Sequence, residues 1–182
     1  YIIFNEPPQE GSLQRWTEIF QAEFSYYDEI KHYVFSWDTG QKQEASGEYA
    51  SFLKANFEFD SAIVLSATQL LEPPHYNHEL QIRKIQSPQA WEEVIALQVH
   101  CADPKYLNDG YEKFKRQQFQ QYQQMSLAGL GNWFGAYLND RLVADLGIYH
   151  QEDVARYQSV GTHPDYRRLG ICGTLVYEAG RA

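Results

Sequence analysis

The sequence predicts an α+β fold in which a central sheet is flanked by helices. In the first 75 residues, segments with helical spacing of apolar residues alternate with short β-rich runs. In the remainder, one strand and two helical segments precede three consecutive strand-like runs and a further helix. The 182 residues are 43% hydrophobic and 15% aromatic, so the chain can bury the core of one full domain, or of one domain and a small companion.

Residues 1–74 are expected to form an N-terminal α/β region with the element order αβαβ. Its predicted elements are a helix over residues 12–30 after a cap at Ser12, a strand over 32–38, a second helix over 47–59 and a β-branched strand over 61–70. The boundary is placed in LLEPPHYNHEL, residues 70–80, because its prolines and polar residues separate two apolar-patterned regions. We interpret the region either as an accessory region or as a degenerate half-domain of a related fold. Only the order of its elements favours the second interpretation.

Residues 75–182 are expected to form the main domain, which opens with a strand and two helices. Residues 79–85 alternate as a half-buried strand. Ser87 and Pro88 are predicted as the N-cap and first-turn residue of a helix whose buried face carries Trp91, Val94, Ile95 and Gln98. A second helix over residues 111–125 is expected to turn its glutamines to solvent and to bury Tyr111, Phe114, Tyr122 and Met125.

Three strands and a helix complete the predicted domain. Residues 133–138 and 142–149 are β-rich runs on either side of a short polar loop, residues 139–141, which is typical of a hairpin. A third strand over residues 154–162 would extend the hairpin to a meander. The last helix is expected to begin near Gly170.

The charge and cysteine content exclude several classes of function. The formal net charge of −9 argues against a nucleic-acid partner, because phosphate binding needs a basic face. Neither a long apolar run nor a basic leader is found, so no membrane partner and a cytoplasmic location are expected. Cys101 and Cys172 lack zinc-site spacing and are expected to be free thiols. His75 and His78 have no matching ligand pattern around them, so no metal site is predicted.

The stretch THPDYRRLGICGTLVYEAG, residues 162–180, carries the strongest functional signal. A strand, a short loop and a glycine-rich helix start can bind phosphate, because the free N–H groups and the helix dipole favour an anion. Arg167 and Arg168 would add positive charge in an acidic chain. On physical grounds alone, close packing at Gly170 and Gly173 with ordinary ion pairs at the arginines explains the pattern equally well. The stretch matches neither the GxGxxG fingerprint nor the GK[ST] of the P-loop.

Residues 160–180 resemble motif A of the GNAT N-acetyltransferase family. The family pattern is a strand ending near Val-x-Pro, followed by [QR]-x-x-G-x-[GA] and a helix. Arg167, Gly170 and Cys172 fall on the three signature positions, and Pro164 and Tyr166 match the loop before them. The third position departs from the family's Gly or Ala, although its side chain is small. The predicted element order from residue 79 onward is also the one that this fold requires, so the resemblance covers residues 79–182.

The resemblance implies a GNAT-type mixed central sheet and the acetyl-CoA-dependent transfer of an acetyl group to a primary amine by direct attack. It implies that Val160, Gly161 and Thr162 pair with the pantetheine arm and supply an N–H to the developing oxyanion. It also implies that main-chain groups hold the pyrophosphate, namely those of Arg167, Arg168, Leu169, Gly170, Ile171, Cys172, Gly173 and Thr174. Acetyl-CoA would be a co-substrate, no metal is implied, and the expected partners are a small-molecule or peptide amine and, in a homodimer, a second copy of the chain.

The general base is the least determined part of the expected site. Some family members carry a glutamate on the strand that leads into the motif, but residues 155–160 include no carboxylate. The nearest acids in the sequence are Asp145 and Glu152, and either could act as a base through a water. Alternatively, Asp145 is simply a polar residue at the edge of the sheet and Glu152 a solvated charge in a loop. Tyr157 could orient the substrate, as could Tyr149, or both could serve only to pack the sheet.

The family fold normally continues beyond the motif A helix, so the C-terminal part of the fold is expected to be absent and the domain truncated after that helix. The lack of a strand carboxylate supports a contrasting hypothesis, a non-catalytic acyl-CoA-binding or regulatory module.

Overall fold

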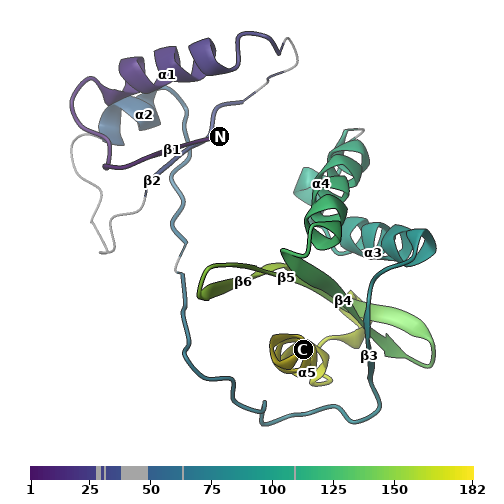
Figure 1. The fold of residues 1–182 in the computed structure, drawn as a ribbon. Helices are drawn as coiled ribbons and strands as arrows, with labels where there is room; N and C mark the ends of the chain where they lie inside the picture. Colours follow the sequence, from purple (N-terminus) through teal and green to yellow (C-terminus); the bar gives the residue numbers. More distant parts are fainter. Residues whose placement is uncertain (28–29, 31, 38–48, 63, 109) are drawn as a thin grey trace. The chain divides into compact units, whose positions relative to one another are not determined.

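A computed structural model of the chain (Figure 1) describes residues 1–27, 30, 32–37, 49–62, 64–108 and 110–182. The described residues fall into two compact units, Tyr1–Leu65 and Ser66–Ala182. The division lies a few residues before the proline-containing stretch in which the sequence places a boundary. The glycine-rich helix start and the strands before it belong entirely to the second unit.

The first unit is a small α/β arrangement around one tryptophan. Its elements are β1 (Ile2–Phe4), α1 (Ser12–Glu23), β2 (Phe35–Trp37) and α2 (Ala50–Lys54), and β1 pairs with β2 in parallel. Trp16 of α1 is fully buried, stacks on Phe4 with ring centroids 4.0 Å apart, and meets Phe35 edge-on at 5.7 Å. The helical spacing of Trp16 and Phe20 therefore predicts this core correctly, since both are buried.

Several sequence expectations for this unit are wrong. The first helix ends at Glu23, its N-cap is Gly11 rather than Ser12, and β1 was not expected. The described residues between 61 and 70 form no strand, and Val64 and Leu65 are 83% and 88% exposed. A β-branched run becomes a strand only where a neighbouring strand pairs with it, and these residues have none. Positions 28, 29, 38, 47, 48 and 63 of the expected elements lie outside the described residues.

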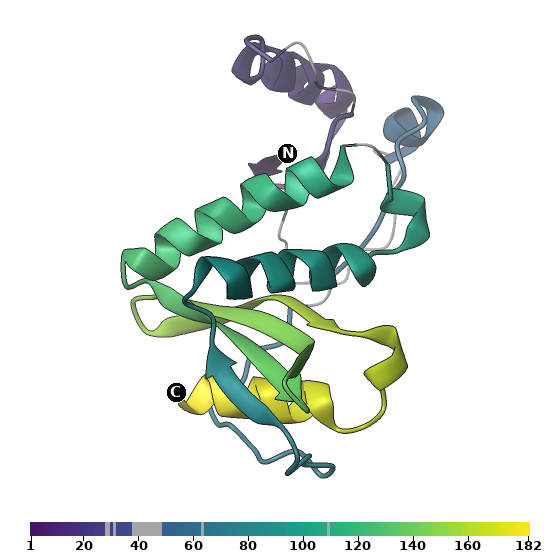
Figure 2. The same cartoon turned by 90° about the vertical axis from the view of Figure 1, so that its right-hand side faces the viewer.

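The second unit is an antiparallel sheet with helices on both faces (Figure 2). Strands β3 (Gln81–Lys84), β4 (Gly131–Leu138), β5 (Arg141–Gln151) and β6 (Val154–Thr162) lie side by side in that order. Helices α3 (Pro88–His100) and α4 (Tyr111–Leu127) cover one face, and α5 (Ile171–Arg181) covers the other. Short 3-10 helices, η2 (Pro104–Tyr106) and η3 (Pro164–Tyr166), lie in the connections. The predicted α+β class is confirmed, and so is the element order predicted for this unit; the first unit has the order βαβα instead of the predicted αβαβ.

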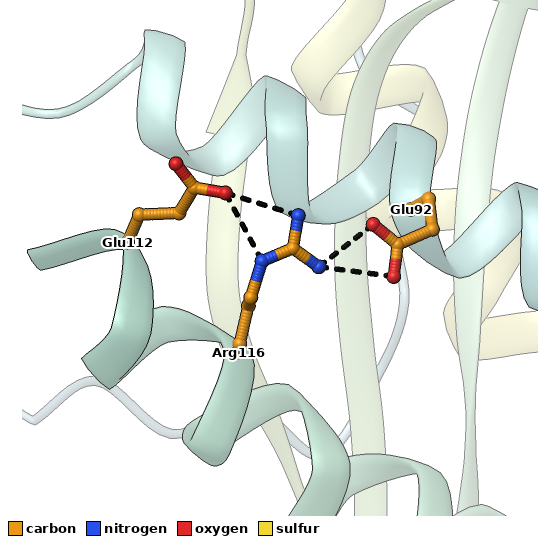
Figure 3. Close-up of polar contacts among 3 residues, drawn as sticks. All are labelled: Glu92, Glu112 and Arg116. Atoms are coloured by element: carbon orange, nitrogen blue, oxygen red, sulfur yellow. Dashed lines mark hydrogen bonds and ion pairs between the residues drawn. The ribbon is translucent and has the colours of Figure 1, made fainter.

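Helices α3 and α4 begin and pair for identifiable reasons. The Ser87 hydroxyl accepts a hydrogen bond from the N–H of Ala90 at 3.1 Å, and Pro88 is the first residue of α3, so the predicted cap is confirmed. On the outer surface, Arg116 of α4 pairs with Glu92 of α3 at 2.7 Å and with Glu112 of its own helix at 3.0 Å (Figure 3). This exposed network links the two helices where their apolar faces do not meet.

The buried face of α4 differs from the predicted stripe. Phe119 is fully buried and packs edge-on against Trp133 with ring centroids 4.8 Å apart, whereas the expected core residue Phe114 is 53% exposed. The stripe on α4 therefore runs through Phe119, Tyr122 and Met125, so the prediction is right for Tyr122 and Met125 and wrong for Phe114. Both alternatives have helical spacing, and only the position of α4 over the sheet selects between them.

The hairpin that joins β4 to β5 is tighter than expected. Asn139 and Asp140 have φ angles of 50° and 58°, and Arg141 already pairs with Leu138. The connection is therefore a two-residue turn with both residues left-handed, a geometry that Asn and Asp tolerate well.

Candidate functional site

A cavity of about 520 Å³ opens where β6 ends and α5 begins. Its volume is in the range of small-molecule sites. Residues from the strand end, from the connecting loop and from the first turn of the helix line it, together with the end of α3: Cys101, Val160, Gly161, Thr162, Tyr166, Arg167, Arg168, Gly170, Ile171, Cys172 and Gly173. The structure thus brings together all the residues expected to bind the cofactor except Leu169 and Thr174, which do not line the cavity.

The backbone of the glycine loop, residues 167–173, turns sharply before it enters α5. Arg168 and Gly170 have φ angles of 62° and 75°, in the left-handed region that a non-glycine residue such as Arg168 rarely adopts. Within the described part of the chain, the N–H groups of Ile171, Cys172 and Gly173 meet no acceptor, and α5 has no side-chain cap. The loop therefore presents three free donors at the positive end of a helix dipole.

Both arginines of the loop are exposed and stay outside ion pairs. Arg167 donates from Nε to the carbonyl oxygen of Thr162 at 3.2 Å, which folds it back on the end of β6. Among the described residues, no carboxylate pairs with either Arg167 or Arg168. The interpretation of the pair as ordinary surface ion pairs is therefore wrong for the described chain, and their charge is available to an anion in the cavity.

Strand β6 carries a bulge immediately before the cavity. Asp145 of β5 pairs with Gly161 and Gly147 pairs with Gln158, so β6 has one residue more than β5 between these pairs. Ser159, inside the bulge, has a φ angle of 45°. On its other side β6 has no neighbouring strand among the described residues, so its outer main-chain groups are open to pairing.

A buried polar network lies directly behind the bulge. Gln98 of α3 donates from Nε2 to the carboxylate of Asp145 at 2.9 Å and to the carbonyl oxygen of Ser159 at 2.7 Å. Trp133 donates from Nε1 to the same carboxylate at 3.0 Å. A Cβ on Gly161 would lie 2.9 Å from Nε2 of Gln98, so a larger residue there would displace the Gln98 amide from the network. The two N–H bonds of the Gln98 amide are thus shared between the carboxylate and the bulge.

Asp145 is fully buried, and burial raises its pKa from 3.8 to about 7. Hydrogen bonds from Gln98 and Trp133 and the charge of Lys115 on α4 oppose this rise. The carboxyl group does not line the cavity but lies behind Gly161, which does. This position suits a residue that shapes the strand more than one that contacts an amine.

The other two catalytic candidates lie away from the cavity. Glu152 is exposed in the turn between β5 and β6, nine residues or roughly 30 Å of strand from Gly161. The hydroxyl of Tyr157 donates to the carbonyl oxygen of Val176 in α5 at 2.9 Å. Tyr149 donates to the carbonyl oxygen of Tyr122 in α4 at 2.9 Å. The structure does not bring these three side chains together with the loop.

Two residues near the site were missed by sequence reasoning. Cys101 lines the cavity from the end of α3. Burial raises the pKa of its thiol, and the negative charge of Asp145 raises it further. His163 is buried just after β6, stacks on His100 at 4.5 Å and contacts Arg141 at 3.2 Å. Burial, with the charges of His100 and Arg141, lowers the pKa of His163. His163 lies within the motif, but no feature of the sequence indicated a role for its side chain, and none indicated a role for Cys101.

Other kinds of site find little support in the described residues. No group of three or more His, Cys, Asp or Glu side chains there could hold a metal ion. Across the same residues, no helix is both long and apolar enough to cross a membrane.

Comparison with protein families identifies part of the chain. Residues 91–180 match the model of the acetyltransferase (GNAT) family. This match spans α3 to α5 and includes the whole cavity. A search of curated proteins finds no significant match to the chain.

Solved structures with a similar fold include one that extends over both units. A conserved protein of unknown function from Staphylococcus epidermidis has a TM-score of 0.66 at 12% identity and covers 98% of this chain and 68% of its own. The PaiA N-acetyltransferase of Thermoplasma acidophilum, in complex with coenzyme A, has a TM-score of 0.47 at 18% identity, with 56% and 70% covered. A GNAT acetyltransferase of Brucella melitensis, in complex with acetyl-CoA, has a TM-score of 0.43 at 16% identity, with 58% and 68% covered.

Proposed function

Residues 91–180 belong to the GNAT acetyltransferase family, and from this premise we propose that the protein is an acetyl-CoA-dependent N-acetyltransferase that moves an acetyl group to a primary amine by direct attack. The observation that carries the proposal is the cavity at the end of β6. Among the described residues, it combines a strand edge without a neighbouring strand, two arginines outside ion pairs and three N–H groups without an acceptor at a helix start.

The donors of the loop suit a pyrophosphate. The N–H groups of Ile171, Cys172 and Gly173 would hold its oxygens, and the left-handed turn at Gly170 lets the backbone approach closely. Arg168 would add a charge-assisted contact from the loop. The chain has a net charge of −9, so this local positive site is needed to attract an anion.

The open edge of β6 suits an extended ligand with amide groups. Val160, Gly161 and Thr162 all line the cavity and lie on the side of the bulge that leads to the loop. The pantetheine arm would pair with this edge as one more strand would. When bound, acetyl-CoA would supply the activated acetyl group at the upstream end of this strand.

The bulge gives the chain's own contribution to the chemistry. An N–H of residues 160–162 would stabilise negative charge that develops on the acetyl oxygen, because a donor fixed before the reaction needs no reorganisation. Gln98 fixes the bulge through the carbonyl oxygen of Ser159, with Asp145 behind it. We therefore assign Asp145 a role in holding the strand, and assign the base to none of the described side chains.

Turnover of acetyl-CoA with a panel of primary amines tests this function. Free thiol release above the rate without amine is the expected result. Tight binding of CoA without thiol release for any amine would contradict the enzyme and support the contrasting hypothesis, a non-catalytic acyl-CoA-binding module. The absence of CoA binding would contradict both.

A further inference from the structure

Residues 73–77, which end three residues before β3 begins, run along the outer side of the glycine loop. They belong to the second unit and precede the part of the chain that the family model matches. Their sequence, PPHYN, indicates on its own only a boundary. In the structure, they contact the loop at three residues and the part of α5 beyond the loop at two, Thr174 and Glu178.

Asn77 forms hydrogen bonds with the chain on both sides of Gly170. Its side-chain Nδ2 donates to the carbonyl oxygen of Leu169 at 2.9 Å, and its main-chain N–H donates to the hydroxyl of Thr174 at 2.8 Å. Thr174 is 1% exposed, so this second bond is inside the protein. One residue outside the loop therefore fixes both its last turn and the first turn of α5.

The bond to Leu169 sets the direction of the next N–H group. In a trans peptide, the carbonyl and the N–H point in opposite directions. Because Asn77 holds the carbonyl of Leu169, the N–H of Gly170 points away from Asn77, and Gly170 itself lines the cavity. The contact thus orients a donor that would face an anion.

Both glycines of the loop pack against the same segment. A Cβ on Gly170 would collide with the carbonyl oxygen of His75, and a Cβ on Gly173 would lie 3.0 Å from Cβ of Pro73. Tyr76 fixes the segment to the helix, since its hydroxyl donates to Glu178 at 2.9 Å. Gly170 is therefore needed on the outer side of the loop as well as on the side of the cavity, and Gly173 leaves little room for a larger residue.

We propose that residues 73–77 act as a clamp that holds the glycine loop in its anion-binding shape, with Asn77 as its main positioning residue. The inference rests on the proposed function for the identity of the anion, the CoA pyrophosphate. The loop is strained at Arg168 and has no side-chain cap of its own, so it depends on an outside contact to keep its shape. A loop held in its binding shape saves the cost of ordering it when the ligand binds.

The test compares Asn77→Ala with Glu79→Ala, because the exposed side chain of Glu79 forms no hydrogen bond or ion pair with the described residues of the loop, and only its main-chain N–H contacts Asn77. Dissociation constants are measured by calorimetry for CoA and, in competition with it, for pantetheine, which lacks the pyrophosphate. Asn77→Ala is expected to weaken CoA binding on the order of tenfold and to leave pantetheine unchanged, because one hydrogen bond to the loop is lost. Glu79→Ala is expected to match the wild type.

A second measurement does not depend on CoA. Amide hydrogen exchange at Thr174, whose N–H donates to the carbonyl oxygen of Gly170, and in residues 175–177 of the free protein is expected to be faster in Asn77→Ala, and to a smaller extent in Tyr76→Phe, than in the wild type. Unchanged exchange and unchanged CoA affinity in Asn77→Ala would overturn the clamp. An equal loss for CoA and pantetheine would also overturn it, because the damage would not be confined to the loop. Faster exchange in a protein that does not bind CoA would support the clamp and refute the proposed function.

Discussion

Arg168 combines an uncommon backbone conformation with an unpaired charge. A left-handed arginine costs on the order of 1 kcal/mol, a cost that proteins tend to retain at functional positions. No carboxylate among the described residues pairs with it, although the chain holds 24 acidic residues. The loop thus directs a strained residue and its charge to the cavity.

Replacing this arginine tests that assignment. Arg168→Ala is expected to weaken CoA binding about tenfold or more, because a charge-assisted contact to phosphate is lost. Arg156→Ala removes another exposed arginine, from β6, at a position that does not line the cavity, and should leave the affinity unchanged. Equal effects of the two substitutions, measured by calorimetry at one ionic strength, would mean that only the overall charge matters.

Asp145 predicts a pH dependence of stability. Its pKa is raised from 3.8 to about 7, so between these values only the unfolded chain ionises, and stability falls as pH rises through this window. The loss is on the order of 4 kcal/mol by pH 7.5 and is absent below about pH 4. Asp145→Asn keeps an oxygen that can accept from Trp133 and Gln98 but cannot ionise. In urea unfolding, the free energy of unfolding of the variant relative to the wild type should therefore be higher at pH 7.5 than at pH 4.5. The same pH dependence in both proteins would contradict the buried acid.

The sequence identified some of these residues but not their contacts. Gln98 was placed on the buried face of its helix with Trp91, Val94 and Ile95, so a buried amide could be expected from spacing alone. Its partners Asp145 and Ser159 lie 47 and 61 residues away and meet it only through the sheet register. The roles of Cys101 and Asn77 could not be predicted for the same reason, because their neighbours in the fold are remote in the sequence.

At the scale of elements, the entry into α5 depends on a glycine in two separate ways. Gly170 has a φ angle of 75° and stands against the carbonyl oxygen of His75. Gly129, after α4, has the same φ angle of 75°, but a Cβ there would meet nothing within 4 Å. A substitution at Gly129 therefore strains the backbone as one at Gly170 does, but causes no collision. Gly129→Ala is expected to cost about 1 kcal/mol in the free energy of unfolding.

Gly170→Ala should cost more than Gly129→Ala and should also weaken CoA binding, which Gly129→Ala should not do. Urea unfolding measures the loss of stability in each variant, and calorimetry with CoA measures the loss of binding. Equal stability losses would contradict the close approach of residues 73–77. Unchanged CoA affinity in Gly170→Ala would contradict the role of the loop.

Periodicity predicted those elements whose pattern is supported by local chemistry. The Ser87 cap, the Asn139 and Asp140 turn and the glycines before α5 all mark element boundaries, and the structure places boundaries there. The strand expected over residues 61–70 had a suitable composition, but no neighbouring strand pairs with its described residues. Composition gives a strand its propensity, whereas only tertiary pairing gives it hydrogen bonds.

At the scale of the whole molecule, the two units offer different environments to a ligand. The first unit contains a larger cavity, of about 860 Å³, lined largely by aromatic side chains of β2, α2 and the residues after them. Among the described residues that line it there is no Lys or Arg, while Glu58 and Asp60 would repel an anion. The cavity at the glycine loop has the opposite character, so size alone does not locate the site of CoA.

Hydrogen exchange of the whole chain, with and without saturating CoA, tests the central claim most directly, because it reports both binding and its place. The proposed site predicts slower exchange in residues 160–162 and 168–173, with the first unit unchanged. Binding that protects the aromatic cavity of the first unit instead, or no protection at the loop in the presence of CoA, would contradict the account.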